Sequence, residues 1–411
     1  MDINSKSNIT KNIKLGILTF IVMNTITVLS PRGFAPEAMY GLTSVFYYIF
    51  AASCFLIPVS LVSAELATGW PQEGGPQVWV HAALGPKWAF VTAWLLWVQM
   101  FFGMVMVSTA FATMIPYVIN RPDLANNNVF IVVTVIITYW FITIINFKAQ
   151  FGKWISTWGA VIGIYIPAVF LIVLGLWYWC KYGNVNLGPL NFDTVIPSLT
   201  SLDKFSFFAG ICFIFAGLEI ASVHANDIEN PKKNYPIAVF ITIIAMVILN
   251  LVAALTEANV IPNAKIDLAV VVQPFKVYFN ILGIPWLTNI MALMVALGTF
   301  AQLNAWVLGP SKAMIKVAEA GLLPPIFQKR NKDNIPVTFV ILQAIVITLV
   351  SLLYVVVPAI NTGFIMILML TTILYCIVYI LILIAEIVLK YKRPDVHRST
   401  PVPGGKMGMW I

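Results

Sequence analysis

Long apolar runs separated by short polar segments make up most of this 411-residue chain. A helix needs roughly 20 apolar residues to cross a lipid bilayer, and ten runs reach that length. We expect membrane helices at about 13–40, 43–68, 88–118, 129–147, 154–180, 205–226, 236–260, 285–315, 336–357 and 362–389. The pattern therefore predicts an all-α polytopic membrane protein.

Composition supports this class and excludes others. Hydrophobic residues make up 60% of the chain and charged residues 10%, whereas soluble domains carry about 25% charged residues. The four cysteines, Cys54, Cys180, Cys212 and Cys376, lie in or at the end of apolar runs and form no CxxC pair. A secreted disulfide scaffold is therefore excluded.

The net charge of +8 follows from where the basic residues fall along the chain. With the N-terminus inside and alternating spans, eighteen Lys and Arg residues lie inside, five lie outside, and Arg32 lies within the membrane. This asymmetry is typical of multi-pass proteins of the inner (plasma) membrane and predicts a cytoplasmic N-terminus. Because the basic residues form no polar domain, we expect the lipid bilayer and no nucleic acid as a partner.

The first predicted span carries residues that interrupt helices. Pro31, Gly33 and Pro36 fall within six residues, beside Arg32 and Glu37. Proline removes a helical hydrogen bond and clashes with the preceding turn. Unwound backbone at membrane depth is tolerated where it is buried in protein or lines a water-filled cavity. The span can also be read as a proline-kinked packing helix.

The sixth span has Gly217 and the intramembrane Glu219, with small residues at Ala216, Ala221 and Ser222. If each half holds five spans, the first and sixth spans occupy corresponding positions, as in transporters built from inverted repeats. Free backbone groups at paired breaks receive a carboxylate and an ammonium group. An α-amino acid is therefore a natural small-molecule ligand.

Several motifs together resemble the amino acid–polyamine–organocation transporters, and among these the bacterial glutamate/GABA antiporters. The resemblance covers nearly the whole chain, and the stretch from Glu219 to Pro236 is specific to the superfamily. The motifs are SAELATGWPQEGG at 63–75, LGPKW at 84–88, FAGLEIASVH at 215–224, ENPKKNYP at 229–236, WVLGPSKAM at 306–314 and PVPGG at 401–405.

The resemblance implies a leucine-transporter-like fold of five plus five inverted helices. The expected organisation is a cytoplasmic N-terminus (1–12), a first five-helix repeat (13–180), a second repeat (205–389) and a cytoplasmic C-terminal segment (390–411). Such transporters usually have two further helices, which would follow residues 403–405. We therefore expect these two helices to be missing and the C-terminal segment to be truncated.

The resemblance also implies the site residues. The substrate would lie against the first and sixth spans, at Asn24, Thr25, Ile26, Thr27, Ser30, Phe213, Ala216 and Gly217. Gating or coupling would involve Arg32, Glu37, Glu219, Gln302, Trp306, Tyr375 and Tyr379. Gln302 stands where the glutamate/GABA antiporters carry an acid, which is a departure from their pattern.

The charged candidates each have two readings. Glu219 is either a proton carrier or a neutral hydrogen-bond donor between helices. Arg32 either contacts an anionic substrate group or gate residue, or forms a fixed pair with Glu37. Glu65 is expected in a structural or gating region at the inner end of the second span. Glu257 and Glu386 are expected to snorkel at span ends.

We therefore expect a secondary active amino acid transporter, an antiporter working by alternating access. A proton-coupled symporter is the alternative. A membrane-embedded enzyme would need a buried catalytic constellation, and a channel would need a filter repeat. The sequence shows neither, so we expect no enzyme activity, no cofactor and no metal. The amino acid carried, and the choice between monomer and homodimer, stay open.

Overall fold

The computed structural model describes residues 16–18, 21, 33–72, 75–147, 158–159, 161–197, 210–212, 214–217, 229–319, 321–357 and 359–408. Within these ranges the chain is helical and has no extended strand. The helices are α2 (Phe34–Ala38), α3 (Thr43–Ala51), α4 (Ile57–Gly69), α5 (Pro76–Leu84), α6 (Pro86–Val118), α7 (Asn128–Asn146), α9 (Ile166–Tyr182), α10 (Phe192–Val195), α13 (Pro231–Val260), α14 (Gln273–Ile281), α15 (Leu287–Glu319), α16 (Val337–Ser351), α17 (Leu353–Val356), α18 (Ile360–Lys392) and α19 (Gly405–Gly408).

Eight helical segments in the described part of the chain are long and apolar enough to cross a membrane. They are Thr43–Gly69, Pro86–Val118, Asn128–Asn146, Val161–Tyr182, Lys233–Val260, Leu287–Val307, Val337–Val356 and Ile360–Lys392. Each coincides with one of the ten predicted spans. The predicted first and sixth spans fall largely outside the described residues.

Local sequence explains where these helices begin and bend. Proline stands in the first turn of α5, α6 and α13, where its missing N–H costs no helical hydrogen bond. The Asn127 side chain caps α7 by accepting from the Phe130 N–H at 3.0 Å. A π-helical turn, Ala52–Leu56, joins α3 to α4 within one span.

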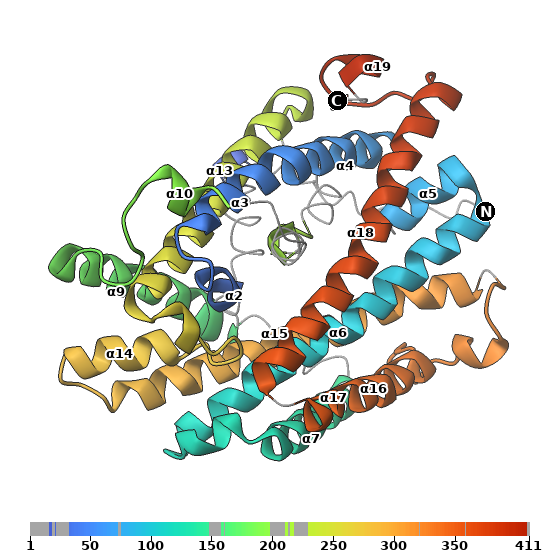
Figure 1. Ribbon diagram of the computed structural model, residues 1–411. Coiled ribbons are helices and arrows are strands. Elements are labelled where there is room, and N and C mark those ends of the chain that lie inside the picture. Colours follow the sequence, from blue (N-terminus) through green and yellow to red (C-terminus); the bar gives the residue numbers. More distant parts are fainter. Residues whose placement is uncertain are drawn as a thin grey trace, which may run out of the picture.

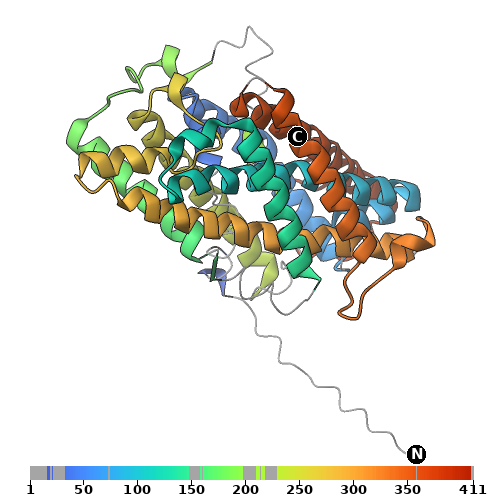
Figure 2. The ribbon, with the colours of Figure 1, turned by 90° about the horizontal axis from the view of Figure 1, so that it is seen from below.

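Helix α6 is central to the packing and contacts α5, α7, α15, α16 and α18. Figures 1 and 2 both place the red α18 beside the light-blue α5 and α6. The π-helical turn before α9 approaches α15 at two glycines. A Cβ on Gly163 would lie 2.2 Å from the Gly298 nitrogen. These backbones can therefore meet because neither residue carries a side chain.

The outer surface is apolar. Helix α7 exposes Val133, Ile137, Phe141 and Ile144 along one stripe, with 49% to 64% of each residue accessible. An unbroken apolar stripe of this kind is unfavourable in water and suits contact with lipid chains. A separate buried cluster joins α4, α5 and α18 through residues such as Leu66, Trp79 and Leu389. This cluster surrounds the two parts of the candidate site described below, which are the turn of the sixth span near Tyr375 and Tyr379 and the buried charges near Leu66 and Leu389.

Candidate functional site

The described part of the sixth span ends in a turn. Residues 210–212 and Ile214 are helical, and Phe215 to Gly217 form a turn. Gly217 has φ +113°, a backbone conformation that a residue with a Cβ rarely adopts. Nothing lies within 4 Å of the position a Gly217 Cβ would take, so the backbone angle and not crowding favours glycine. The turn lies in the stretch where the sequence predicts an interruption. The residues that follow it lie outside the described part of the chain, so the interruption itself stays a prediction.

The backbone of this turn meets two tyrosines of α18. The Gly217 N–H donates a hydrogen bond to the Tyr379 hydroxyl oxygen at 3.3 Å. Tyr379 packs edge-on against Tyr375 and against Phe55 of the π-helical turn, with ring centroids 4.9 Å apart in both pairs. Both tyrosines are buried, and Ala216 packs against the cluster that contains them. The structure thus brings together Ala216, Gly217, Tyr375 and Tyr379.

The other predicted site residues are placed less completely. Gln302 and Trp306 lie half-buried on α15, and Trp306 packs against the largest core cluster. Outside the described residues lie Asn24, Thr25, Ile26, Thr27, Ser30, Arg32, Phe213 and Glu219. The proposed substrate contacts of the first span, and the readings of Arg32 and Glu219, therefore stay predictions.

Glu37 is fully enclosed between helices. It lies on α2, which packs against α13, and its side chain is 1% exposed. Both of its carboxyl oxygens are buried without a hydrogen-bond partner. Glu257 of α13 lies near enough to act on it electrostatically and has one such oxygen of its own. Two buried acids that act on each other electrostatically disfavour double ionisation.

The expectation that Glu257 and Glu386 snorkel is wrong. Glu257 is 2% exposed and Glu386 is fully buried. A glutamate has a shorter apolar stem than lysine or arginine, and neighbouring helices cover both residues before their carboxyl groups can reach the surface. Both carboxyl groups lie inside the protein.

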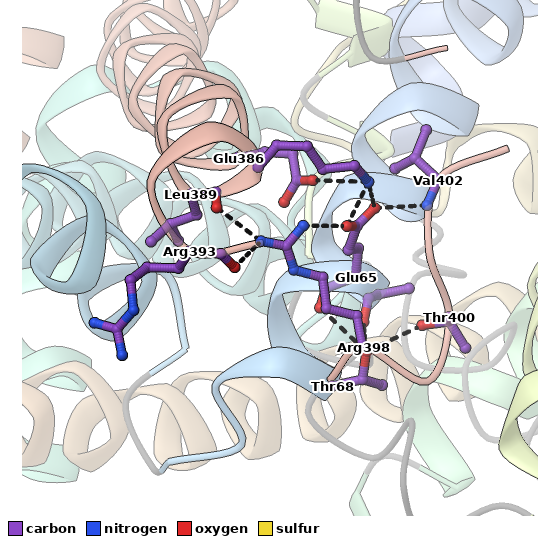
Figure 3. Close-up of polar contacts among 10 residues, drawn as sticks. Glu65, Thr68, Glu386, Leu389, Arg393, Arg398, Thr400 and Val402 are labelled. Atoms are coloured by element: carbon purple, nitrogen blue, oxygen red, sulfur yellow. Dashed lines mark hydrogen bonds and ion pairs between the residues drawn. The ribbon is translucent and has the colours of Figure 1, made fainter. Parts of the chain in front are cut away.

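A second polar centre lies where α4 and α18 end, and we call Glu65, Glu386, Lys390 and Arg398 the Glu65 cluster (Figure 3). The fully buried Glu65 carboxylate accepts from Lys390 Nζ at 2.5 Å and from Arg398 Nη1 at 2.7 Å. It also accepts from the Val402 backbone N–H at 2.6 Å. Every charge-assisted contact of this kind offsets part of the cost of burying the carboxylate.

The residues that follow α18, 393–402, form what we call the return segment, and Arg398 fixes it. Its Nη2 atom donates to the Leu389 carbonyl oxygen at 2.9 Å and to the Arg393 carbonyl oxygen at 3.3 Å. Its guanidinium group also lies 5.3 Å from the Trp70 ring centroid. The Thr68 and Thr400 hydroxyl oxygens are 3.3 Å apart. The return segment thereby joins α18 to the end of α4.

Sequence reasoning did not assemble this cluster, although it singled out Glu65. One local signal was present, because Glu386 and Lys390 stand four residues apart and so share one face of a helix. The contacts to Glu65 span more than 320 residues along the chain, and nothing in the local pattern reports them. Phe55 was also missed, since an aromatic residue in an apolar run is usually a packing residue.

Eight apolar helical segments of membrane-spanning length, packed together in the described part of the chain, are those of a multi-pass membrane protein. The family profile described as "Amino acid permease" matches residues 15–411. The chain therefore belongs to the amino acid permease family, within the amino acid–polyamine–organocation superfamily.

Characterised and uncharacterised relatives are similar over most of their length. An uncharacterized transporter of Legionella pneumophila is 32% identical over 398 residues, covering 96% of this chain and 85% of the relative. A glutamate/gamma-aminobutyrate antiporter of Lactococcus lactis subsp. lactis is 29% identical over 407 residues, covering 97% and 80%. A probable agmatine/putrescine antiporter of the same organism is 27% identical over 334 residues, covering 78% and 68%. The family and these relatives are transporters, which indicates that the chain is not an enzyme.

Proposed function

We propose that this protein is a secondary active amino acid antiporter that works by alternating access. The observation that carries the proposal is the turn at residues 215–217 of the sixth span, where the Gly217 N–H meets the Tyr379 hydroxyl group. A helix interrupted inside a membrane protein exposes backbone groups to a ligand. Two relatives, a glutamate/gamma-aminobutyrate antiporter and a probable agmatine/putrescine antiporter, add support.

The proposed substrate follows from the chemistry of a broken helix. Free N–H groups and the positive end of a half-helix attract a carboxylate, and free carbonyl groups attract an ammonium group. The two ends of an α-amino acid match these two kinds of backbone group. Tyr375 and Tyr379 would close the site on the α18 side, where Tyr379 packs against both Phe55 and Tyr375.

The proposed orientation places the Glu65 cluster on the cytoplasmic side. Lys390 and Arg398 belong to the C-terminal basic residues that the positive-inside rule assigns to the cytoplasm. The N-terminus would then also be cytoplasmic.

A proton-coupled symporter is the second candidate, and one observation favours it. Glu37 and Glu257 are buried acids with unpartnered oxygens, and such groups inside membrane proteins commonly take part in proton relays. A coupled proton would then replace the counter-substrate of an antiporter.

A competition panel tests the substrate class. Purified protein in liposomes would take up a labelled amino acid while unlabelled amino acids and their decarboxylation products compete at two pH values. We expect competition from compounds that keep an amino group, with the strongest competition from those that also keep the α-carboxylate. If no compound of either class competes for uptake, the proposed function is wrong.

A further inference from the structure

Glu386 lies beside a cation whose hydrogen bonds go elsewhere. Its nearer carboxyl oxygen is 3.6 Å from Lys390 Nζ, and both of its oxygens are buried without a hydrogen-bond partner. Lys390 instead donates to both oxygens of Glu65, across the contact between α18 and α4. Lys390 therefore keeps a longer ion pair with Glu386 while its hydrogen bonds go to Glu65.

The members of the cluster divide unequally between the two helices. Glu65 is the charged member on α4, whereas Glu386 and Lys390 are both on α18. Arg398 belongs to the return segment and is bound to α18 through the carbonyl oxygens of Leu389 and Arg393. Both cations would therefore stay with α18 if the two helix ends moved apart (Figure 3).

Separation of the helix ends would change the partners of each charge. Arg398 would lose Glu65 and keep its two carbonyl acceptors. Lys390 would lose all of its hydrogen bonds to Glu65, and an unpaired ammonium group inside a protein is strongly unfavourable. Glu386 is one helical turn away on the same helix, so it remains within reach of the flexible lysine side chain.

We propose that Lys390 exchanges hydrogen-bond partners during transport, donating to Glu65 while α4 and α18 are joined and to Glu386 once they part. This proposal rests on the proposed function, because alternating access is what would separate the helix ends. The exchange keeps Lys390 hydrogen-bonded to a carboxylate in both states. Glu386 is thus a positioning residue for the open state, and in the joined state it holds Lys390 only through the longer ion pair.

A cross-linking experiment separates the two states without needing a substrate. The double variant Thr68→Cys/Thr400→Cys would be used, because the hydroxyl oxygens of Thr68 and Thr400 lie 3.3 Å apart in the joined state. The four native cysteines would be replaced so that only this pair can cross-link. Glu386→Gln is expected to increase cross-linking, because it removes the partner of the parted state. Glu65→Gln is expected to decrease cross-linking, because it removes the partner of the joined state.

Transport provides the second measurement. Glu386→Gln should lower the exchange rate by about tenfold, a typical size for coupling between sites, with substrate affinity at equilibrium much less affected. Lys392→Gln is the matched control, because this lysine is exposed on the same turn of α18 and should change neither measurement. In a Lys390→Met background, adding Glu386→Gln should have no further effect on either measurement.

Three results would overturn the proposal. Unchanged cross-linking and exchange in Glu386→Gln would show that Lys390 does not use this acid. Decreased cross-linking would show that Glu386 supports the joined state. An effect of Glu386→Gln that persists in the Lys390→Met background would show that Glu386 does not act through Lys390.

A second variant covers the case in which Glu386→Gln fails to fold. Glu386→Asp keeps the carboxyl group on a side chain that is one methylene shorter, and it should shift cross-linking in the same direction. No shift would overturn the proposal. If the wild-type protein transports no amino acid, the proposed function fails while the cross-linking outcomes still report on the exchange.

Discussion

Buried acids in this protein fall into two kinds according to what surrounds each carboxyl group. Glu65 accepts hydrogen bonds from an ammonium group, a guanidinium group and a backbone N–H. Glu37 has no hydrogen-bond partner for either oxygen, and Glu257 has one oxygen without a partner. Equal burial therefore has opposite consequences for stability, because the charge is compensated in Glu65 alone.

Conservative substitutions should separate these two kinds of acid. Glu65→Gln leaves Lys390 and Arg398 without their carboxylate, and removing one partner of a buried pair typically costs about 3–5 kcal/mol. Glu257→Gln removes a carboxyl group with an unpartnered oxygen and should leave stability unchanged or raised. Thermal unfolding of both variants in detergent measures the difference. A larger loss of Tm in Glu257→Gln than in Glu65→Gln would contradict this assignment.

The Tyr379 hydroxyl group accepts a hydrogen bond from the Gly217 N–H, whereas the Tyr379 ring packs against aromatic neighbours. Tyr379→Phe should keep the packing against Phe55 and Tyr375 and remove the acceptor for the Gly217 N–H, a net loss of about 1 kcal/mol. We expect a lower Tm and slower exchange. Tyr48→Phe is the control, because the Tyr48 hydroxyl group is buried without a partner. Equal loss in both variants would argue against a role for the Tyr379 hydroxyl group.

At the scale of helices, the turn in the sixth span depends on one glycine. Gly217→Ala forces a Cβ into φ +113°, and conformations of this kind cost of order 1–3 kcal/mol for other residues. Exchange should fall strongly because the turn that frees the backbone is disturbed.

Gly103→Ala provides a control of opposite sign. Gly103 lies inside α6 with nothing within 4 Å of its Cβ position, so alanine gains up to about 1 kcal/mol of helix propensity there. Circular dichroism melting and exchange assays of both variants test the contrast. A normal exchange rate in Gly217→Ala would show that transport does not depend on this turn.

The sequence predicted the helices well because the bilayer requires long apolar runs, and eight of the ten predicted spans recur, most ends differing by three residues or fewer. It predicted a break in the sixth span from that span's correspondence with the proline-rich first span, and a turn is present there at residues 215–217. It could not predict the cluster around Glu65, which depends on residues more than 320 positions apart. It also misplaced Glu257 and Glu386, since exposure depends on neighbouring helices that a single run does not reveal.

For the whole molecule, the charged residues serve two separate functions in this account. Most basic residues lie in connections between spans and set the orientation in the membrane. A few are enclosed, and the Glu65 cluster joins α4 to α18 away from the aromatic residues at the sixth-span turn. We therefore predict a substrate site at the first and sixth spans and a separate ionic contact that follows the conformational state.

Counterflow in liposomes is the decisive test of whether this protein is an amino acid exchanger. Vesicles containing the purified protein would be loaded with an unlabelled amino acid and given a trace of labelled amino acid outside. We predict rapid, saturable accumulation of label that requires substrate on both sides and no pH gradient. Accumulation that needs a proton gradient and no internal substrate would identify a symporter, and non-saturating conductance would contradict a carrier mechanism altogether.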